Sequence, residues 1–270
     1  DGDVTATATN GVGNIEGLAT GDARHEYGNP VGTEINDDNS GVIRYVSLRH
    51  GGEVIGANNE INGLTLGGVG TGTTIDHVEV IGNKDDGFEF FGGTVNAKYL
   101  VAMHNDDDYC DTDQGWNGKI QYFYGVQGPD NSGGANNQGD NGFELDGDDA
   151  ATNAANGGIP SNPTIYNGTL IARNINDEGI EGKERTQGTY ANCVFARFQQ
   201  GLNMTTAVET NWNANTFNVK NCTFQGVTNN LRINGAVPAG GSPAQNKFTA
   251  DGNLVVAAQT LIDATYTLTG

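Results

Sequence analysis

The chain has 270 residues with 42 glycines and 36% hydrophobic residues, and its 33 acidic against 13 basic residues give a net charge of −20 at pH 7. The hydrophobic residues fall in short clusters, which excludes collagen and a disordered linker, and no window is long enough for membrane insertion. The charge excludes nucleic acid, because phosphate binding needs clustered Lys and Arg. It favours a divalent cation, although surface acid also serves solubility.

Residues 1–40 are polar and Gly-rich and lack helical periodicity, so we expect an irregular N-terminal part. No basic, apolar leader is present, so any signal peptide has been removed.

From residue 41 onward, short runs of β-forming residues recur at fixed offsets. Residues 78–89 recur in outline at 100–111, and residues 179–181 recur at 201–203, both at an offset of 22, while residues 192–195 recur at 221–224. A period near 22 with Asn, Asp and Gly at the corners is typical of a β-helix, whose short strands stack about 4.8 Å apart. The pattern fits neither a leucine-rich repeat nor an immunoglobulin-like sandwich. We therefore predict an all-β, right-handed parallel β-helix.

The repeats predict one domain over residues 1–270, with regular coils over 41–235 and a terminal coil or strand over 236–270. Two loop excursions, 128–140 and 147–163, flank the strand at Phe143 and are rich in Gly, Asn and Asp. Such excursions build the binding face of a solenoid or are tolerated insertions.

The register of the repeats predicts two columns of inward-facing residues. The first column is Phe88, Cys110, Phe143, Ile180, Leu202 and Leu231. The second is Val78, Leu100, Ile171, Cys193 and Cys222. The cysteines are therefore expected to be small core residues, and a disulfide between Cys193 and Cys222 remains open.

Four segments carry a resemblance to a family. They are RYVSLRHGG at 44–52, NEINGLTLGGVG at 59–70, DDGFEFFGGTV at 85–95 and DDYCDTDQGW at 107–116. They resemble bacterial cell-surface, right-handed β-helix repeat proteins of the pectate-lyase-like superfamily, over roughly residues 40 to 200. The resemblance implies the fold and a secreted or cell-surface location, but no reaction. Such proteins usually carry further strands before a stretch like residues 14–17, so it also implies that the chain is a fragment.

An acidic column lies just outside the first inward column in the same register. Successive coils place there Glu89, Asp111, Glu144 and Glu181, then Asn203 and Arg232. The neighbouring corner column holds Asp86, Asp108, Asn141 and Glu178. Carboxylates about 5 Å apart repel each other by about 1 kcal/mol in water and more at lower dielectric, so stacked acids need a cation or protons between them.

Ca²⁺ is the predicted cofactor, because it binds six to eight oxygens in irregular geometry. The predicted ligands are Asp86, Glu89, Asp108, Asp111, Asp113, Glu144, Asp146, Glu178 and Glu181. Further carboxylates close in sequence are Asp85, Asp106, Asp107, Asp148 and Asp149. A solvated acidic stripe without metal is the alternative.

The same stripe could also serve an enzyme. A glycoside hydrolase needs two carboxylates at a set separation, and a polysaccharide lyase combines Ca²⁺ with a basic residue. The catalytic candidates are Asp86, Asp108, Asp111, Lys183 and Arg185, with His104 as a further base. Aromatic residues also cluster at Trp116 and at 122–124, where they either fill the coil or stack on sugars.

These features favour an extracellular, non-catalytic module for adhesion, scaffolding or filament formation, which binds glycan or other copies of itself. A polysaccharide lyase or glycoside hydrolase is the runner-up, and a calcium-stabilised spacer between other domains is the third alternative. The sequence shows no capping element, and residues 254–268 look like further strand, so we expect end-to-end assembly or additional domains.

Overall fold

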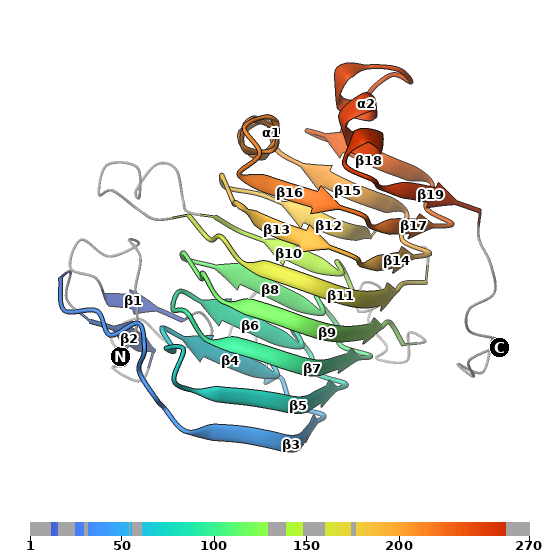
Figure 1. The fold of residues 1–270 in the computed structure, drawn as a ribbon. Helices are drawn as coiled ribbons and strands as arrows, with labels where there is room; N and C mark the ends of the chain where they lie inside the picture. Colours follow the sequence, from blue (N-terminus) through green and yellow to red (C-terminus); the bar gives the residue numbers. More distant parts are fainter. Residues whose placement is uncertain are drawn as a thin grey trace.

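Two sheets of parallel strands run along the length of the stack, one behind the other in Figure 1. The computed structural model describes residues 12–15, 25–29, 32–53, 55, 61–128, 139–147, 160–173 and 177–257. The seven-stranded sheet contains β4 (Leu64–Gly67), β6 (Phe88–Phe91), β8 (Cys110–Asp113), β10 (Phe143–Leu145), β12 (Glu178–Gly182), β15 (Gln200–Met204) and β18 (Asn229–Ile233).

The ten-stranded sheet carries the longer strands of the lower coils and paired short strands above them. It contains β3 (Val42–Arg49), β5 (Thr74–Ile81), β7 (Asn96–Met103), β9 (Lys119–Val126), β11 (Thr164–Ile171), β13 (Gly188–Ala191), β14 (Val194–Ala196), β16 (Phe217–Lys220), β17 (Thr223–Gln225) and β19 (Leu254–Val256). Each coil from β3 to β18 contributes to both sheets, which confirms the all-β, parallel β-helix fold.

The first inward column is confirmed residue by residue. Phe88 pairs with Cys110, Cys110 with Phe143, and the series continues upward through the remaining members of the column. All six side chains are fully buried. The acidic column lies one residue further along these strands, as its register predicts, so Glu89 pairs with Asp111 and Glu144 with Glu181.

The second inward column is wrong at Ile171. Gly168 occupies that position, and its backbone N–H donates to Cys193 Sγ over 3.3 Å. Ile171 instead pairs with Val126 and Ala196, in a small cluster apart from the main core. The reason is that 25 residues rather than 22 separate the two corresponding positions of β11 and β14.

The three cysteines are buried free thiols, as their role as core residues predicts. Cys193 and Cys222 stack on neighbouring coils directly before the paired Val194 and Thr223, and their thiols contact the carbonyls of Ala191 and Lys220 over 3.4 Å. The alternative of a disulfide between them is therefore not realised.

Each coil bends within the larger sheet at one residue with positive φ. The register places these residues in one column, which is Tyr45, His77, Tyr99, Tyr122, Asn167, Asn192 and Asn221. Their φ angles lie between 53° and 65°. Asn tolerates this conformation better than other residues with a side chain, which accounts for the three upper positions.

Two helices were not predicted from the sequence. Helix α1 (Thr206–Asn213) follows β15, where 29 residues rather than 22 separate stacked positions. Its N-cap Thr205 accepts a hydrogen bond from the Val208 N–H, and Val208 and Trp212 on one face are buried. The additional residues of this coil therefore form an amphipathic helix.

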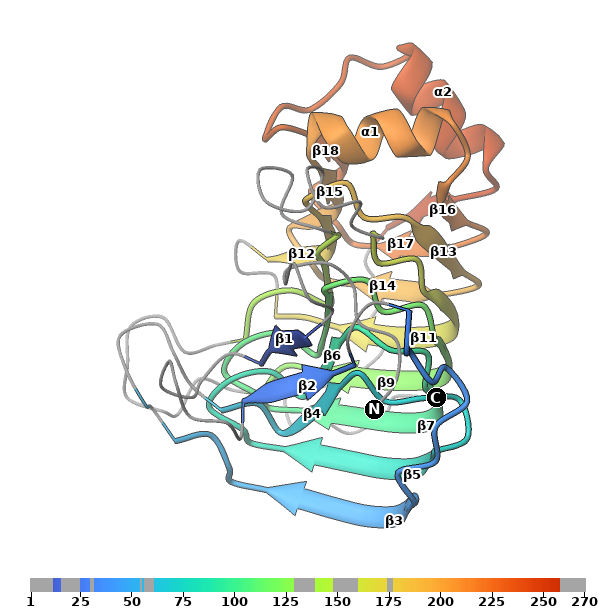
Figure 2. The same ribbon diagram turned by 90° about the vertical axis from the view of Figure 1, so that its left-hand side faces the viewer.

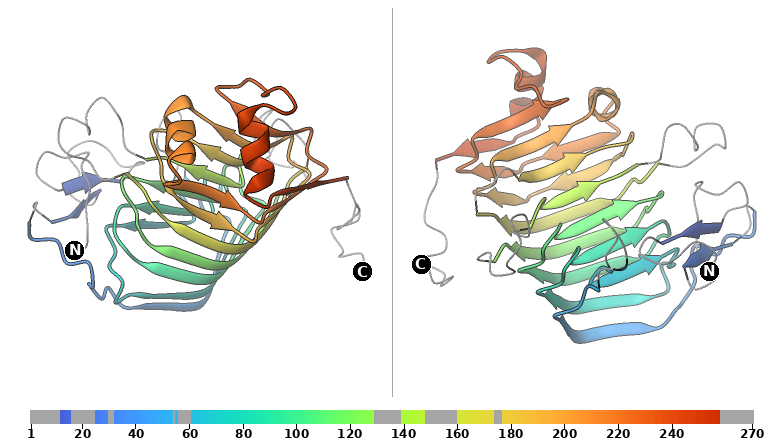
Figure 3. Two further views of the ribbon diagram at one scale, coloured as in Figure 1. Left: turned by 45° about the horizontal axis from the view of Figure 1, so that its top comes forward. Right: turned by 180° about the vertical axis from the view of Figure 1, so that it is seen from behind.

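Helix α2 (Pro243–Ala250) begins after the N-cap Ser242 and lies over the C-terminal end of the stack in Figure 3. Phe248 is buried and its ring contacts that of Phe224, with centroids 5.2 Å apart. Helix α2 shows that the expectation of no capping element is wrong. The terminal strand expected within 236–270 is present as β19, which pairs with β17. Neither helix is long and apolar enough to cross a membrane.

An antiparallel pair, β1 (Val12–Asn14) and β2 (Glu26–Gly28), lies within the N-terminal part that was expected to be irregular. It sits beside the lower coils in Figure 2, and the Tyr27 ring contacts Phe91. Most of both predicted excursions, together with residues 258–270, lies outside the described residues.

Candidate metal centre

A ladder of hydrogen bonds links the corners that precede the strands of the smaller sheet. Asn62 Oδ1 accepts from the Asp86 N–H over 3.2 Å, and Asp86 Oδ1 accepts from the Asp108 N–H over 3.0 Å. Asp108 Oδ1 then accepts from the Asn141 N–H, and Asn141 Oδ1 from the Glu178 N–H over 3.3 Å. One side-chain oxygen per coil thus satisfies the backbone of the next coil.

Asp108 is the most buried carboxylate of this ladder. Its side chain is 0% exposed, and its second oxygen, Oδ2, has no hydrogen-bond partner among the described residues. The amides of Asn62 and Asn141 make the same ladder bond without a charge. The ladder therefore does not explain why Asp rather than Asn occupies this corner.

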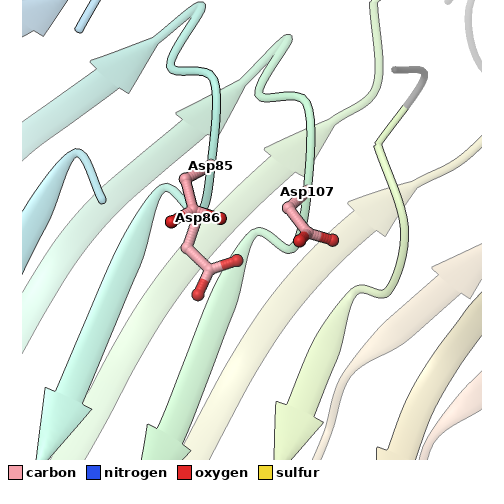
Figure 4. A group of neighbouring side chains, drawn as sticks. All are labelled: Asp85, Asp86 and Asp107. Atoms are coloured by element: carbon pink, nitrogen blue, oxygen red, sulfur yellow. The ribbon is translucent and has the colours of Figure 1, made fainter. Parts of the chain in front are cut away.

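Carboxylates from neighbouring coils converge around Asp86 and Asp108. Three groups offer ligand atoms within 4.8 Å of one another: Asp85 with Asp86 and Asp107, Asp86 with Glu89 and Asp111, and Asp107 with Asp108 and Asp140. We call these seven residues the acid cluster. Figure 4 shows its first group, with Asp85 and Asp86 on one turn and Asp107 on the turn of the next coil.

The pKa values in the acid cluster are raised because the carboxyl groups are buried beside one another. Burial raises the pKa of Asp86 and Asp111 well above the usual range, and Asp108 beside Asp86 and Asp146 beside Asp111 raise it further. Burial also raises the pKa of Asp108 to about 6, against the effect of the hydrogen bond from Asn141. Protons or a cation must therefore offset this charge.

The upper acids of the predicted ladder have partners within the protein. Lys183 contacts the Glu144 carboxylate and lies 3.5 Å from Asp146 Oδ2. Arg232 lies 3.5 Å from Glu178, the Asn203 amide donates to Glu178 over 3.3 Å, and the same amide donates to Glu181 over 3.2 Å. None of these four acids belongs to the three groups among the described residues.

The predicted ligands therefore divide into two sets. The structure brings Asp86, Glu89, Asp108 and Asp111 together, and it places Glu144, Asp146, Glu178 and Glu181 beside nitrogen-bearing side chains. Asp113 lies outside the three groups. Asp148 and Asp149 lie outside the described residues.

Asp140 was missed by the sequence-based prediction, because it lies at the end of an excursion where no repeat offset applies. Asp140 directly precedes the corner residue Asn141, and this position could have identified it from the sequence. Burial raises the pKa of Asp140 to about 6, and Asp108 raises it further.

Of the predicted bases, Lys183 lies on the acidic column, where it contacts two carboxylates. Arg185 lies in the following turn, and its carbonyl accepts a hydrogen bond from Asn211 over 2.7 Å. Burial lowers the pKa of His104, and the nearby Arg173 lowers it further. This arrangement can bind a hard cation, and Lys183 neutralises Glu144 and Asp146 beside it.

Comparison with known proteins agrees with this architecture. The family described as the pectate-lyase-like β-helix domain matches residues 7–263. A search of curated proteins finds no match. The matched residues include all strands from β1 to β19, whose parallel stacking is that of a β-helix. The chain therefore belongs to the family of pectate-lyase-like β-helix domains.

Proposed function

We propose that the chain is a non-catalytic extracellular β-helix module whose lower and middle coils are held together by Ca²⁺ in the acid cluster. The observation that carries this proposal is the buried Asp108 carboxylate, whose Oδ2 has no hydrogen-bond partner among the described residues. An unsatisfied buried polar group costs about 1 to 3 kcal/mol, and more when it is charged. A cation that accepts irregular oxygen ligands removes that cost, and Ca²⁺ does so more readily than Mg²⁺.

A location outside the cell, secreted or on a bacterial surface, accords with this site, because extracellular modules bind Ca²⁺ with dissociation constants of about 10⁻⁴ to 10⁻³ M. The proposed role is adhesion or scaffolding, with a glycan or another copy of the chain as partner. Helix α2 covers part of the C-terminal end, which argues against filaments of coils stacked end to end.

Melting temperatures in EDTA, Ca²⁺ and Mg²⁺ test the cation site. The wild-type melting temperature should fall in EDTA and recover with Ca²⁺, because a ligand that binds the folded state stabilises it. Asp108→Asn keeps the ladder bond and should lose most of the calcium response. Glu181→Gln is the matched control and should keep that response, since Asn203 already donates to Glu181. A wild-type protein that melts at one temperature in all three conditions contradicts the proposal.

A polysaccharide lyase is the second candidate, and Lys183 is the observation that favours it. Its ammonium group lies on the acidic column, where a sugar carboxylate bridged by Ca²⁺ would be held. Calcium-dependent release of unsaturated uronate from polygalacturonate, abolished in Lys183→Ala, would establish the lyase. Absence of release from a panel of acidic polysaccharides would support the non-catalytic module.

A further inference from the structure

A groove crosses the larger sheet over β3, β5, β7, β9 and β11, and none of its lining residues belongs to the acid cluster. It encloses about 620 Å³, a size typical of ligand-binding pockets. One wall is the column of corner residues, Tyr45, His77, Tyr99, Tyr122 and Asn167. The other wall is the next outward row of the same strands, Ser47, Glu79, Val101, Tyr124 and Thr169.

The aromatic wall is a continuous stack of rings. Ring centroids are 4.7 Å apart between Tyr45 and His77, 4.5 Å between His77 and Tyr99, and 4.9 Å between Tyr99 and Tyr122. Tyr45, Tyr99 and Tyr122 are 73%, 41% and 43% exposed. By contrast, Trp116 and Phe123 are buried in the core, so the aromatic cluster predicted from the sequence divides between core and surface.

The backbone conformation at these corners does not favour tyrosine. Tyr45, Tyr99 and Tyr122 have φ angles of 55°, 56° and 65°, in the left-handed region that bulky residues rarely occupy. The upper coils form the same corner with Asn, which tolerates it better. Ring stacking offsets part of the strain. The strained tyrosines occur in the coils that line the groove.

The carboxylates at the groove are paired with arginines. Glu79, the carboxylate in the lining, lies 2.6 Å from Arg49, and Asp76 lies 3.3 Å from Arg44. The Lys98 ammonium lies 5.8 Å from the centroid of the Tyr99 ring. The lining therefore presents hydroxyl groups, an amide and ring edges, and its carboxylate is paired.

We propose that this groove binds a neutral polysaccharide, which lies across the coils. Hydroxyl side chains both donate and accept hydrogen bonds, as sugar hydroxyls do, and aromatic rings offer apolar area against the C–H groups of sugars. The lining repeats once per coil, about every 4.8 Å, and so suits a polymer with its own short repeat. This proposal rests on the proposed function, whose glycan partner it assigns to a chemical class, and none of the lining residues is a proposed cation ligand.

Affinity electrophoresis in calcium buffer tests the proposal, with hydroxyethylcellulose, galactomannan, starch or polygalacturonate in native gels. At least one neutral polymer should retard the wild-type chain. The double variant Tyr99→Asn, Tyr122→Asn should bind that polymer about tenfold more weakly, the equivalent of a lost aromatic contact. Because the upper coils use Asn at this corner, the double variant should melt no lower than the wild type. Asp108→Asn should bind like the wild type, which separates the groove from the cation site.

Several outcomes would overturn the groove assignment. These are no retardation by any neutral polymer, retardation by polygalacturonate alone, and equal retardation of the wild type and the double variant. Sedimentation velocity gives a fourth outcome. A wild type that is a dimer and a double variant that is a monomer would assign the groove to a second copy of the chain.

Discussion

At the scale of single residues, the corner before each strand of the smaller sheet has one structural task, to accept a backbone N–H from the next coil. Asn62 and Asn141 perform it with amides, whereas Asp86 and Asp108 perform it with buried carboxylates. At these two corners, negative charge stands where the neighbouring corners have a neutral amide. In the coils above, Lys183 and Arg232 supply the positive charge.

Removing the Lys183 ammonium should destabilise the upper coils. Lys183→Met leaves Glu144 and Asp146 without their cation, so unfolding in urea at pH 8 should show a loss of about 1 to 2 kcal/mol. The Lys220→Met variant is the control, because no ion pair of Lys220 is present among the described residues. Equal stability of Lys183→Met and the wild type would show that the pair contributes nothing.

In chelator, the stability of the folded protein should fall as pH rises. This is the reverse of the usual case, in which carboxylates with lowered pKa values make stability rise with pH. The folded-state pKa is about 6 for Asp108 and about 8 for Asp146, both raised by burial, and both lie above the value of about 3.9 in an unfolded chain. The folded state therefore binds more protons, and stability falls as pH rises from about 4 through 8. In EDTA the melting temperature should be lower at pH 8 than at pH 5, and Ca²⁺ should reduce the difference. A melting temperature in EDTA that rises over this interval contradicts the assignment.

At the scale of elements, the strands could be predicted from the sequence and the helices could not. In-register stacking repeats a residue type at a fixed offset, so the columns of Phe88 and Glu89 were recognisable. An inserted helix changes the offset without a repeat of its own, as α1 and α2 do. The sequence also could not show which acids of the column cluster together and which are paired with a basic side chain. That depends on which carboxylates the side chains of Lys183 and Arg232 contact.

Helix α2 should contribute measurably to stability through Phe248. This side chain is 1% exposed and contacts Phe224, so Phe248→Ala leaves a cavity at the C-terminal end of the core. We expect a loss of about 3 to 5 kcal/mol in the free energy of unfolding. Val237→Ala is the control, because Val237 is 51% exposed. Equal effects of the two substitutions would mean that α2 does not cap the stack.

At the scale of the whole molecule, the acid cluster and the proposed glycan groove belong to different sheets. The acid cluster lies at the corners and strands of the smaller sheet, over the coils of β6, β8 and β10, and the groove lies on the larger sheet. The two sets of residues do not overlap, so we expect a cation in the acid cluster to stabilise the coils of the groove without contacting the ligand of the groove.

Hydrogen exchange should show that the cation acts locally. Calcium removal should increase amide exchange in β6 and β8, whose corners carry the acid cluster, and should change β15 and β17 little. The reason is that parallel coils contact only their neighbours, so a local loss of stability spreads weakly along the stack. Uniform acceleration along the whole chain would contradict a local cation site.

Calorimetric titration of Ca²⁺ into the chelator-stripped chain at pH 7 tests the central claim most directly. The acid cluster predicts saturable binding with a dissociation constant of about 10⁻³ M or lower. Repeating the titration in two buffers of different ionisation enthalpy should show proton release, because the raised pKa values leave protons for Ca²⁺ to displace. The Asp108→Asn variant should bind markedly more weakly, and Glu181→Gln should bind as the wild type does. No saturable binding at concentrations about tenfold above that range, or equal binding by Asp108→Asn, would contradict the account.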